Sequence, residues 1–389
     1  MKRKISVVVV LFLVFMIFGS AFVTKFEEFL DWKQINDDRL TKQEKTDFES
    51  QLSTKTFYYY NRLNSEQKQA YIMIYSMFNN FSESRRLEIT EEDLKDIFVA
   101  VLYDNSEMFW VDIKYNFIDY GDSIEFMPNY RMKSEQARKM SGVLNKRIEK
   151  IVKSAENLIT DYEKELYFHD YVCGVTVYTE ETFGNMGDTA YSALINGEAI
   201  CEGYSRAMQL LLDRAGIKNY LVVGDGKTEN RIESHMWNIV EIDGKKYHLD
   251  VTWNDTGAEN RVGYLYFNVN DEFISRDHFN LVPANNNCTE FYANYFVMNN
   301  LFVESFKDFD ELVSPAAKAL NTGDNTVEIL FNDEYELRKA IEWIENNNYQ
   351  FFDFVGDVVE LSGRDLQKDE VEYYTMEECN YFCIIFKEG

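Results

Sequence analysis

The spacing of hydrophobic and polar positions in the first third of the chain predicts helices followed by one hairpin. Residues 26–100 are mainly amphipathic with helical spacing, and Thr90 with Asp93 is typical of a helix start. Polar and apolar positions then alternate over residues 108–131, which is the period of a strand with one buried face. Tyr120-Gly121-Asp122 interrupts this alternation and indicates the turn of a hairpin.

Helical spacing returns in the middle of the chain. A polar, amphipathic helix is expected over about 134–157, and the capping-box pair Thr160 and Glu163 predicts a second helix. The stretch "NGEAICEGYSRAMQLLLDRAGI", residues 196–217, begins as a turn and continues with apolar residues at helical spacing. It therefore places Cys201 on the first turn of a largely buried helix.

After Ile217 the pattern alternates with the period of strands. "NYLVVGD" (219–225) and "GYLYFNVND" (263–271) are expected as strands. "HMWNIVEI" (235–242) and "KKYHLDVTW" (245–253) flank Asp243-Gly244, a strong signal for a two-residue hairpin loop. Helices thus precede an antiparallel sheet, which predicts an α+β fold.

Shifts in composition divide the chain into five parts. An Asn-rich stretch near 285–287 and Thr322-Gly323-Asp324 mark a linker before a last α/β segment. The expected parts are a signal peptide or membrane anchor (1–23), an N-terminal helical region with a hairpin (24–130), a core (131–283), a linker (284–325) and a small α/β appendage (326–389).

The N-terminus predicts export from the cytoplasm. Residues 5–23 carry no charge, and as a helix they would span roughly 28 Å, close to the hydrocarbon thickness of a bilayer. Lys2, Arg3 and Lys4 form a basic flank that should stay in the cytoplasm, while Gly19-Ser20-Ala21 offers a cleavage site. The remainder of the chain is therefore expected outside the cytoplasm, either anchored or secreted.

Composition excludes several classes of function. The chain of 389 residues is 46% hydrophobic and carries a net charge of −27, so it is globular and acidic. Binding to nucleic acid needs clustered Lys and Arg and is excluded, and contact with membrane is expected only through the N-terminal segment. "GDGKT" (224–228) lacks the glycine that opens a phosphate-binding loop, and no HExxH motif occurs. Neither a cofactor nor a metal is expected.

The five cysteines do not form a disulfide framework, because their number is odd and their spacing irregular. Cys379 and Cys383 are most simply two residues on one face of a C-terminal strand. Cys201 has two readings: a packed small hydrophobe, or a nucleophile at a helix N-terminus, whose partial positive charge stabilises a thiolate.

The hairpin supplies a histidine and an acid that could act with Cys201 as a nucleophile. With a loop of Asp243-Gly244, Ile242 faces Lys245, and by the same register Asp250 lies opposite Trp237. His235 and Asp250 are then diagonal neighbours on one face, within reach of a side-chain hydrogen bond. A cysteine, a histidine and an acid in this order are the arrangement for nucleophilic catalysis, and Tyr191 is a weak candidate for a second oxyanion donor.

The other three histidines are expected to have structural roles. His169 lies within a helix and is expected at the surface or with satisfied hydrogen bonds. His248 shares the face of His235 but lies farther from the strand end, and His278 is expected in a loop after the sheet.

These stretches resemble the transglutaminase-like superfamily in the branch found in bacterial surface proteins. The resemblance is carried by "ICEGYSRAMQLLLDRAGI", "SHMWNIVEIDGKKYHLDVTWND" and "YLYFNVND", densely over about 190–270. It extends loosely to "YDNSEMFWV", where Ser106 replaces the usual proline of the family, and does not reach the C-terminal hundred residues.

The resemblance implies a papain-like fold with Cys201, His235 and Asp250 as catalytic residues. The function it implies is a cysteine acyl transferase or hydrolase acting on amide bonds of peptides, proteins or cell wall. A surface module that keeps the fold for binding alone is the alternative.

Overall fold

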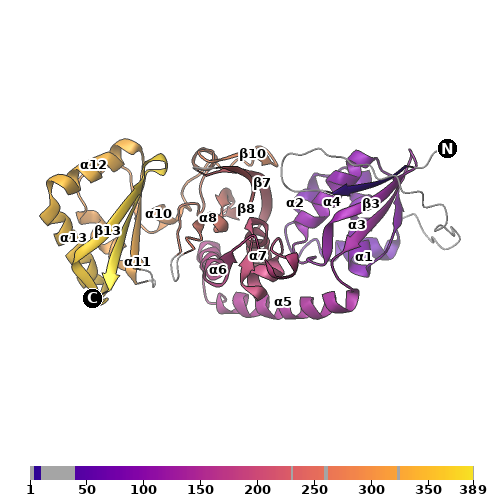
Figure 1. Ribbon diagram of the computed structural model, residues 1–389, viewed down its shortest axis with the longest axis horizontal. Coiled ribbons are helices and arrows are strands. Elements are labelled where there is room, and N and C mark those ends of the chain that lie inside the picture. Colours follow the sequence, from indigo (N-terminus) through magenta and orange to yellow (C-terminus); the bar gives the residue numbers. More distant parts are fainter. Residues whose placement is uncertain (1–3, 10–39, 229–230, 258–261, 322–324, 389) are drawn as a thin grey trace.

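The computed structural model describes residues 4–9, 40–228, 231–257, 262–321 and 325–388, which form three bodies along one long axis (Figure 1). Within these ranges, none of the helices combines the length and apolar character that a membrane span requires. Most of the expected signal peptide or anchor (1–23) lies outside the described residues, so export stays a prediction. Its residues Lys4–Val9 form strand β1.

The N-terminal body is an antiparallel sheet with helices packed against it. The strand order is β1-β3-β4-β2, with β3 at Val111–Asp119, β4 at Ile124–Tyr130 and β2 at Arg85–Leu87. The predicted hairpin is thereby confirmed. The helices are α1 (Lys42–Glu49), α2 (Tyr58–Arg62), α3 (Ser65–Asn80) and α4 (Glu91–Asp104).

A buried carboxylate joins three of these helices. Asp104, the last residue of α4, accepts hydrogen bonds from the backbone N–H groups of Tyr59 and Tyr60 at 3.0 and 2.8 Å. The hydroxyl of Tyr71 in α3 donates to the same carboxylate at 3.1 Å. Asp104 therefore satisfies backbone donors of the first turn of α2, which would otherwise lack acceptors.

The central body confirms the α+β prediction. Its helices are α5 (Ser134–Ser154), α6 (Asp161–Val175) and α7 (Cys201–Ala215). The antiparallel sheet has the order β10-β7-β8-β9, with β7 at Asn219–Lys227, β8 at Ile232–Ile242, β9 at Lys245–Leu249 and β10 at His278–Val282. Helix α7 packs on β8, and the short pair β5 (Val177–Tyr178) and β6 (Glu198–Ala199) precedes α7.

The two-residue hairpin loop has the predicted register. Ile242 pairs with Lys245, and the ladder continues to the pair of Asn238 and Leu249. Asp243 and Gly244 have positive φ angles of 50° and 75°, as a type I′ turn requires. The expected strand 245–253 nevertheless stops at Leu249, and its last residues form the short helix α8 (Val251–Asn254).

A second expected strand, 263–271, is absent, and a specific side chain explains the difference. The carboxamide oxygen of Asn254 accepts the backbone N–H of Tyr266 at 2.8 Å, and the N–H of Phe267 turns back to the carbonyl of Tyr264. Asn268 has a φ of 54°, which breaks an extended run. Of this segment only Val269 keeps a bridge, to His248, and α9 follows at Asp271–Ile274.

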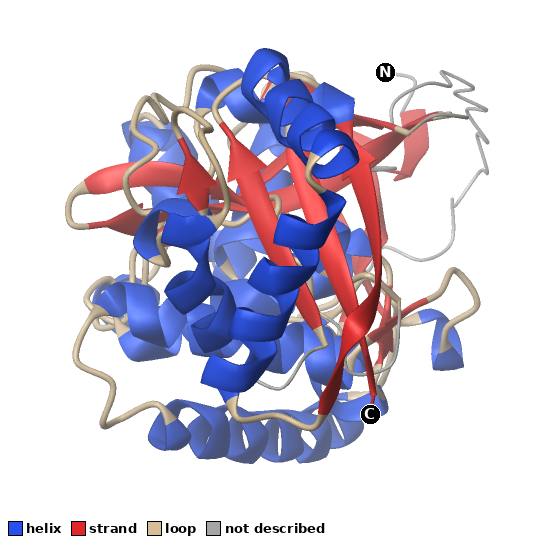
Figure 2. Ribbon diagram, turned by 90° about the vertical axis from the view of Figure 1, so that its left-hand side faces the viewer, coloured by secondary structure: helices blue, strands red, loops and turns tan. Residues whose placement is uncertain are grey.

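The C-terminal body has its own sheet in the order β11-β12-β14-β13. Its strands are β11 (Phe302–Val303), β12 (Thr326–Phe331), β13 (Leu366–Met376) and β14 (Tyr381–Glu388), and its helices are α11 (Val313–Leu320), α12 (Glu334–Asn346) and α13 (Asn348–Ser362). Figure 2, which views the molecule from this side, shows the helices lying against one face of the sheet.

Two details of this body differ from the expectations. The expected linker 284–325 contains β11 and α11, and β11 pairs in parallel with β12, so part of that segment belongs to the C-terminal body. Cys379 lies in a short 3-10 turn between β13 and β14 rather than on a strand with Cys383, because Asn380, with a φ of 56°, reverses the chain there.

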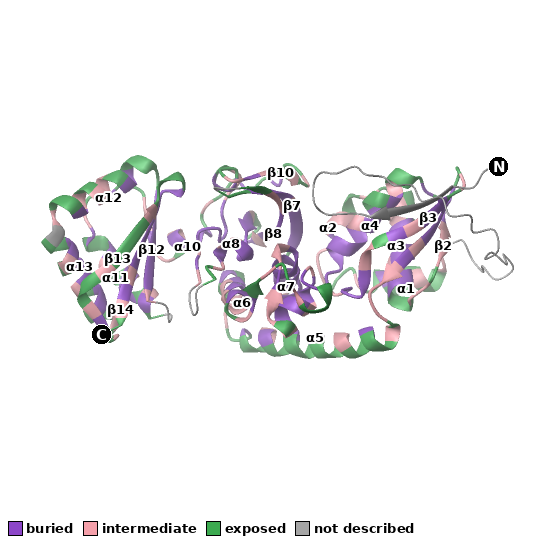
Figure 3. Ribbon diagram, in the orientation of Figure 1, coloured by how far each residue is buried: buried purple, intermediate pink, exposed green. Residues whose placement is uncertain are grey.

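The three bodies share a core. One cluster of buried hydrophobic side chains runs through all three, and Figure 3 shows the buried positions concentrated on the sheets and on α7. A smaller cluster covers the other face of the central sheet and contains Tyr220, Val222, Trp237, Ile239 and Cys288. Both faces of the central sheet are therefore packed. His235, which lies on this sheet, is only 5% exposed.

Candidate active site

Cys201 is the first residue of α7 and differs from the other cysteines in its exposure. It is half-buried with a free thiol, whereas Cys173, Cys288, Cys379 and Cys383 are free and buried. Ile200 caps the helix with an extended backbone and no side-chain hydrogen bond. Within the described part of the chain, no acceptor is recorded for the N–H of Cys201, so this donor is available at the helix N-terminus.

A glycine two residues later fixes the position of this first turn. A Cβ atom on Gly203 would lie 2.3 Å from the carbonyl oxygen of Gly187 and 2.8 Å from the Cβ of Ala199. The same carbonyl oxygen accepts the N–H of Ile200 at 3.1 Å. Any larger residue at 203 would displace the turn that carries Cys201, which gives the Cys-x-Gly spacing a physical reason.

The structure brings His235 and Asp250 together as the hairpin predicts. His235 lies on β8 opposite Gly224, and its Nε2 is 2.5 Å from Oδ2 of Asp250. Asp250 directly follows β9 and caps α8, where its Oδ1 accepts the N–H groups of Thr252 and Trp253 at 3.0 and 3.1 Å. One carboxylate oxygen is thus held by the backbone, and the other is directed at the imidazole.

The electrostatics of this pair follow from burial and charge. Burial alone would lower the pKa of His235, but the charge and hydrogen bond of Asp250, together with a hydrogen bond to Cys201, raise it to about 10. Burial would raise the pKa of Asp250, but His235 and His278 hold it well below its usual range. The imidazole therefore lies between an ionised carboxylate and a thiol.

His278 contacts the same carboxylate, which the sequence did not indicate. Its Nε2 is 3.0 Å from Oδ2 of Asp250, and its Nδ1 is 2.5 Å from Oδ1 of Asp277. His278 was expected in a loop, but it begins β10, which pairs with β7 opposite Gly226. The segment is only five residues long and contains a left-handed Asn280, so its pattern does not resemble a strand. The adjacent Asp277 was the only feature of the local sequence that indicated a hydrogen-bonded imidazole.

The remaining histidines are buried and satisfied. His248 accepts a hydrogen bond from Nε1 of Trp237 at 2.9 Å through Nδ1, and its Nε2 lies 2.9 Å from Oδ1 of Asp271. His169 contacts Asp170 through Nδ1 and the carboxamide of Asn254 through Nε2. Both are fully buried, so neither lies in the cleft described below.

Two clusters among the described residues have the residue types of a metal site: His235, Asp250 and His278, and His248, Asp271 and Cys288. In the first, the nitrogen–oxygen separations of 2.5 and 3.0 Å suit hydrogen bonds, whereas donors about 2.1 Å from one zinc ion lie about 3.3 Å apart. In the second, Nδ1 of His248 accepts a hydrogen bond from the indole N–H of Trp237, so Nε2 carries the ring hydrogen and offers no lone pair. Both clusters fit hydrogen bonding better than metal binding.

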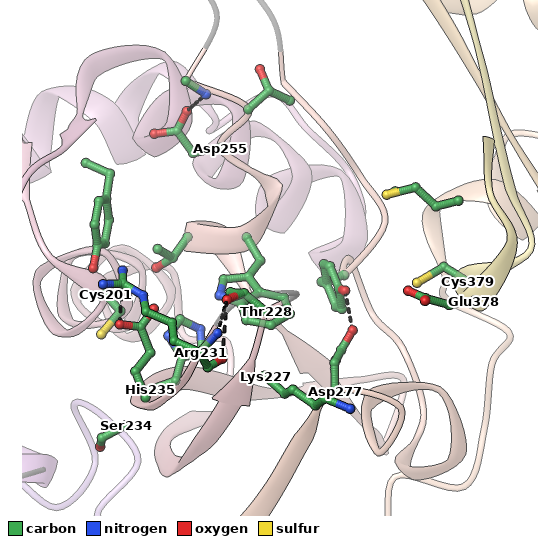
Figure 4. A pocket seen from close by; sticks show the side chains of 18 of the residues that line it. Cys201, Lys227, Thr228, Arg231, Ser234, His235, Asp255, Asp277, Glu378 and Cys379 are labelled. Carbon is green, nitrogen blue, oxygen red and sulfur yellow. Dashed lines mark hydrogen bonds and ion pairs between the residues drawn. The ribbon is translucent and has the colours of Figure 1, made fainter. Parts of the chain in front are cut away.

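Cys201 and His235 lie at one end of a cleft of about 830 Å³ (Figure 4). The other end is formed by residues 375–379 of the C-terminal body, and Figure 4 shows Glu378 and Cys379 across the cleft from Cys201. The walls between contain Tyr178, Lys227, Thr228, Arg231, Glu233, Ser234, Thr252, Trp253, Asp255, Thr256, Gly257, Tyr266 and Asp277. The C-terminal appendage thus forms part of the same cleft as the cysteine.

The cleft carries more acidic than basic side chains. Lys227 and Arg231 are its basic residues, and Arg231 pairs with Glu233 at 3.1 Å. Among its acids, Asp277 accepts a hydrogen bond from the hydroxyl of Tyr266 at 2.6 Å. Glu378 forms no ion pair with the described residues, so its charge is available to a ligand.

Tyr178 places a hydroxyl near the thiol. It lines the cleft, and burial and the nearby Cys201 raise its pKa to about 12, so the phenol keeps its proton. Tyr191, the donor suggested by the sequence, packs its ring 5.1 Å from that of Phe109 and is not among the residues that line the cleft.

Comparison with known proteins identifies the domain that carries this arrangement. Residues 148–251 match the model of the transglutaminase-like superfamily. No curated protein sequence matches the chain.

Solved structures of low similarity match parts of the chain. One described as a TGase has 17% identity and a TM-score of 0.26, over 45% of this chain and 53% of its own. A candidate cysteine protease from Cytophaga hutchinsonii has 16% identity and a TM-score of 0.24, over 28% and 37%. A candidate protease from Parabacteroides distasonis has 14% and 0.21, over 34% and 29%. The chain spans about a third to a half of the length of these structures.

Proposed function

Because residues 148–251 form a transglutaminase-like domain, we propose that this protein is an extracytoplasmic cysteine acyl transferase or hydrolase acting on amide bonds of peptides, proteins or cell wall. One observation carries the proposal. The imidazole of His235 hydrogen-bonds to the Asp250 carboxylate, and Cys201 lines the same end of an open cleft and helps to raise the pKa of His235.

In the first half of the reaction, the thiolate of Cys201 attacks the amide carbonyl carbon and forms a carbon–sulfur bond. The tetrahedral intermediate collapses as the carbon–nitrogen bond breaks, and the His235 imidazolium gives its proton to the leaving amine. A thioester on Cys201 and a neutral His235 remain. Asp250 orients the imidazole and stabilises its charged form throughout.

In the second half, a water molecule or an amine attacks the thioester carbon while His235 removes its proton. The carbon–sulfur bond then breaks, which releases a carboxylic acid or a new amide and restores the thiolate beside the imidazolium. Water as acceptor gives hydrolysis, and a primary amine gives transfer.

We assign two donors to the oxyanion of both intermediates. The backbone N–H of Cys201 lies at the N-terminus of α7, where the helix dipole favours negative charge. The hydroxyl of Tyr178, which lines the cleft from β5, is the second donor.

A labelling experiment tests the proposal. The full-length protein is treated with a panel of peptides that carry an electrophilic ketone in place of the amide, and adducts are located by mass spectrometry. We expect the adduct on Cys201, and its loss in Cys201→Ala. Cys379→Ala is the matched control, because Cys379 lines the same cleft but burial raises its pKa to about 11.

The same panel separates the enzyme from a binding module. A protein that binds the peptides tightly, yet forms no adduct on Cys201 and releases no amine from peptide amides, would not be the enzyme proposed. Release of amine with water, or incorporation of a fluorescent primary amine, then distinguishes hydrolysis from transfer.

A further inference from the structure

Oδ2 of Asp250 is shared between two imidazoles. Nε2 of His235 lies 2.5 Å away and Nε2 of His278 lies 3.0 Å away. Oδ1 of the same carboxylate is already occupied by two backbone N–H groups. Every strong interaction of Asp250 is therefore accounted for by its own α8 cap and these two rings.

The ring of His278 has a carboxylate at each nitrogen. Nδ1 is 2.5 Å from Asp277 and Nε2 is 3.0 Å from Asp250. Oδ2 of Asp250 belongs to an ionised carboxylate, which accepts hydrogen bonds and cannot donate them, so Nε2 of His278 is the donor in their contact. The ring of His278 is thus held at both nitrogens, between two acids.

The surroundings of His278 leave its ring one orientation. It is fully buried, and its centroid lies 4.3 Å from Trp253, 4.9 Å from Trp237 and 5.5 Å from Tyr266. Asp277 is itself held by the Tyr266 hydroxyl at 2.6 Å. The titratable side chains facing the pair of imidazoles are thus Asp250, Asp277, Cys201 and Tyr266.

We propose that His278 is a positioning residue for the reaction described above: it fixes Oδ2 of Asp250 in line with His235 and so keeps the His235 imidazolium beside Cys201. This proposal rests on the proposed function, because the reaction that His278 assists is the one proposed there. Without His278, Oδ2 would have a single partner, and the carboxylate could rotate about its backbone-held oxygen.

His248 provides a matched control. It is equally buried, lies on β9 at the other edge of the same sheet, and has its Nε2 2.9 Å from the carboxylate of Asp271, but it does not contact Asp250. A general loss of packing would affect His248→Leu and His278→Leu alike. Only His278→Leu removes a contact to Asp250.

The test measures how the rate of Cys201 alkylation by iodoacetamide depends on pH, which needs no amide substrate. In the wild type we expect fast alkylation at mildly acidic pH, where an ordinary thiol is protonated. His278→Leu should slow this acidic reaction about 10- to 100-fold, less than the loss in Asp250→Asn, while His248→Leu should leave it unchanged. His278→Gln, whose amide can still donate to Oδ2, should recover part of the loss.

The other possible results distinguish a failure of the positioning role of His278 from a failure of the proposed function. If Asp250→Asn slows alkylation and a folded His278→Leu does not, the positioning role is wrong and the proposed function stands. If the wild-type thiol itself reacts as an ordinary thiol, the proposed function fails. Should His278→Leu not fold, ¹⁵N spectra of the wild type decide: a hydrogen on Nε2 of His278 that bonds to Asp250 supports the proposal, and an Nε2 without a hydrogen overturns it.

Discussion

The hydroxyl of Ser205 lies 2.8 Å from the carbonyl oxygen of Met236, and this contact joins the helix of the cysteine to the strand of the histidine. The carboxamide of Asn238 adds a second link by donating to the carbonyl oxygen of Ser205 at 3.0 Å. Ser205 is one helical turn after Cys201, and Met236 follows His235 directly. The separation of thiol and imidazole is therefore set by hydrogen bonds as well as by packing.

Replacing Ser205 by alanine should disturb this separation. We expect Ser205→Ala to lower kcat several-fold with little change in KM, and to cost about 1 kcal/mol of unfolding free energy, since one hydrogen bond is lost. Steady-state kinetics and urea unfolding measure the two effects. Ser154→Ala is the control, because that hydroxyl bonds only within its own helix, to the carbonyl of Lys150; an equal loss of kcat in both variants would contradict the prediction.

The charge of Asp250 should set the alkaline limit of activity. The His235 pKa of about 10 depends on Asp250, which outweighs the effect of burial, so the imidazolium persists until the pH approaches that value. In Asp250→Asn the effect of burial dominates, and the pKa of His235 falls. We expect the alkaline limb of kcat/KM to move to lower pH, and kcat to fall about 10²–10⁴-fold.

A pH–rate profile checks this shift. Asp255→Asn is the comparison, since Asp255 lines the same cleft but bonds to the hydroxyl of Tyr204 instead of an imidazole. An alkaline limb that stays in place in Asp250→Asn would show that the carboxylate does not control His235.

Tyr178 should contribute to the transition state and little to binding. Tyr178→Phe removes the hydroxyl and keeps the ring, so we expect kcat to fall about 10- to 100-fold at unchanged KM. The exposed Tyr292→Phe is the control. A rise in KM at constant kcat would instead assign Tyr178 to substrate binding.

Glu165 should make stability depend on pH. Burial raises its pKa from the ordinary 4.5 to about 8, and its Oε1, like Oδ1 of its neighbour Asn268, has no partner among the described residues. A raised carboxyl pKa means that the folded state keeps a proton that the unfolded state releases. Stability should therefore fall as the pH rises from about 4.5 to about 8, by up to about 4 kcal/mol.

Glu165→Gln imitates the neutral acid and should flatten this dependence, with the variant more stable than the wild type at pH 8. Denaturant unfolding at pH 5, 6.5 and 8 measures it, with the exposed Glu156→Gln as the control. A wild-type stability that is constant over this range would refute the assignment.

Local signals in the sequence predict the parts of the site that depend on local geometry. The two-residue loop Asp243-Gly244 leaves only one register for the hairpin, and this register places His235 and Asp250 on one face. The N-cap Thr90 and the capping box at Thr160 likewise mark helix starts that the structure has. These predictions needed no knowledge of distant contacts.

The features that the sequence did not reveal depend on residues far apart along the chain. His278 reaches Asp250 only because β10 folds back along β7, and nothing in the pattern near 278 indicates that pairing. The expected strand over 263–271 fails because Asn254 binds the backbone of Tyr266. The far wall of the cleft comes from residues 375–379, far along the chain from the matched residues 148–251.

The residues that form the far wall of the cleft lie in a different part of the chain from the reacting residues. The thiol and its partners lie within residues 201–278, whereas Thr375 to Cys379, on the opposite side of the cleft, are the end of β13 and the short turn that follows it. Turns of this kind tolerate insertion and substitution far better than a packed strand does. Evolution, or a protein engineer, can therefore alter which chains enter the cleft by editing one short surface turn, while the reacting groups stay as they are.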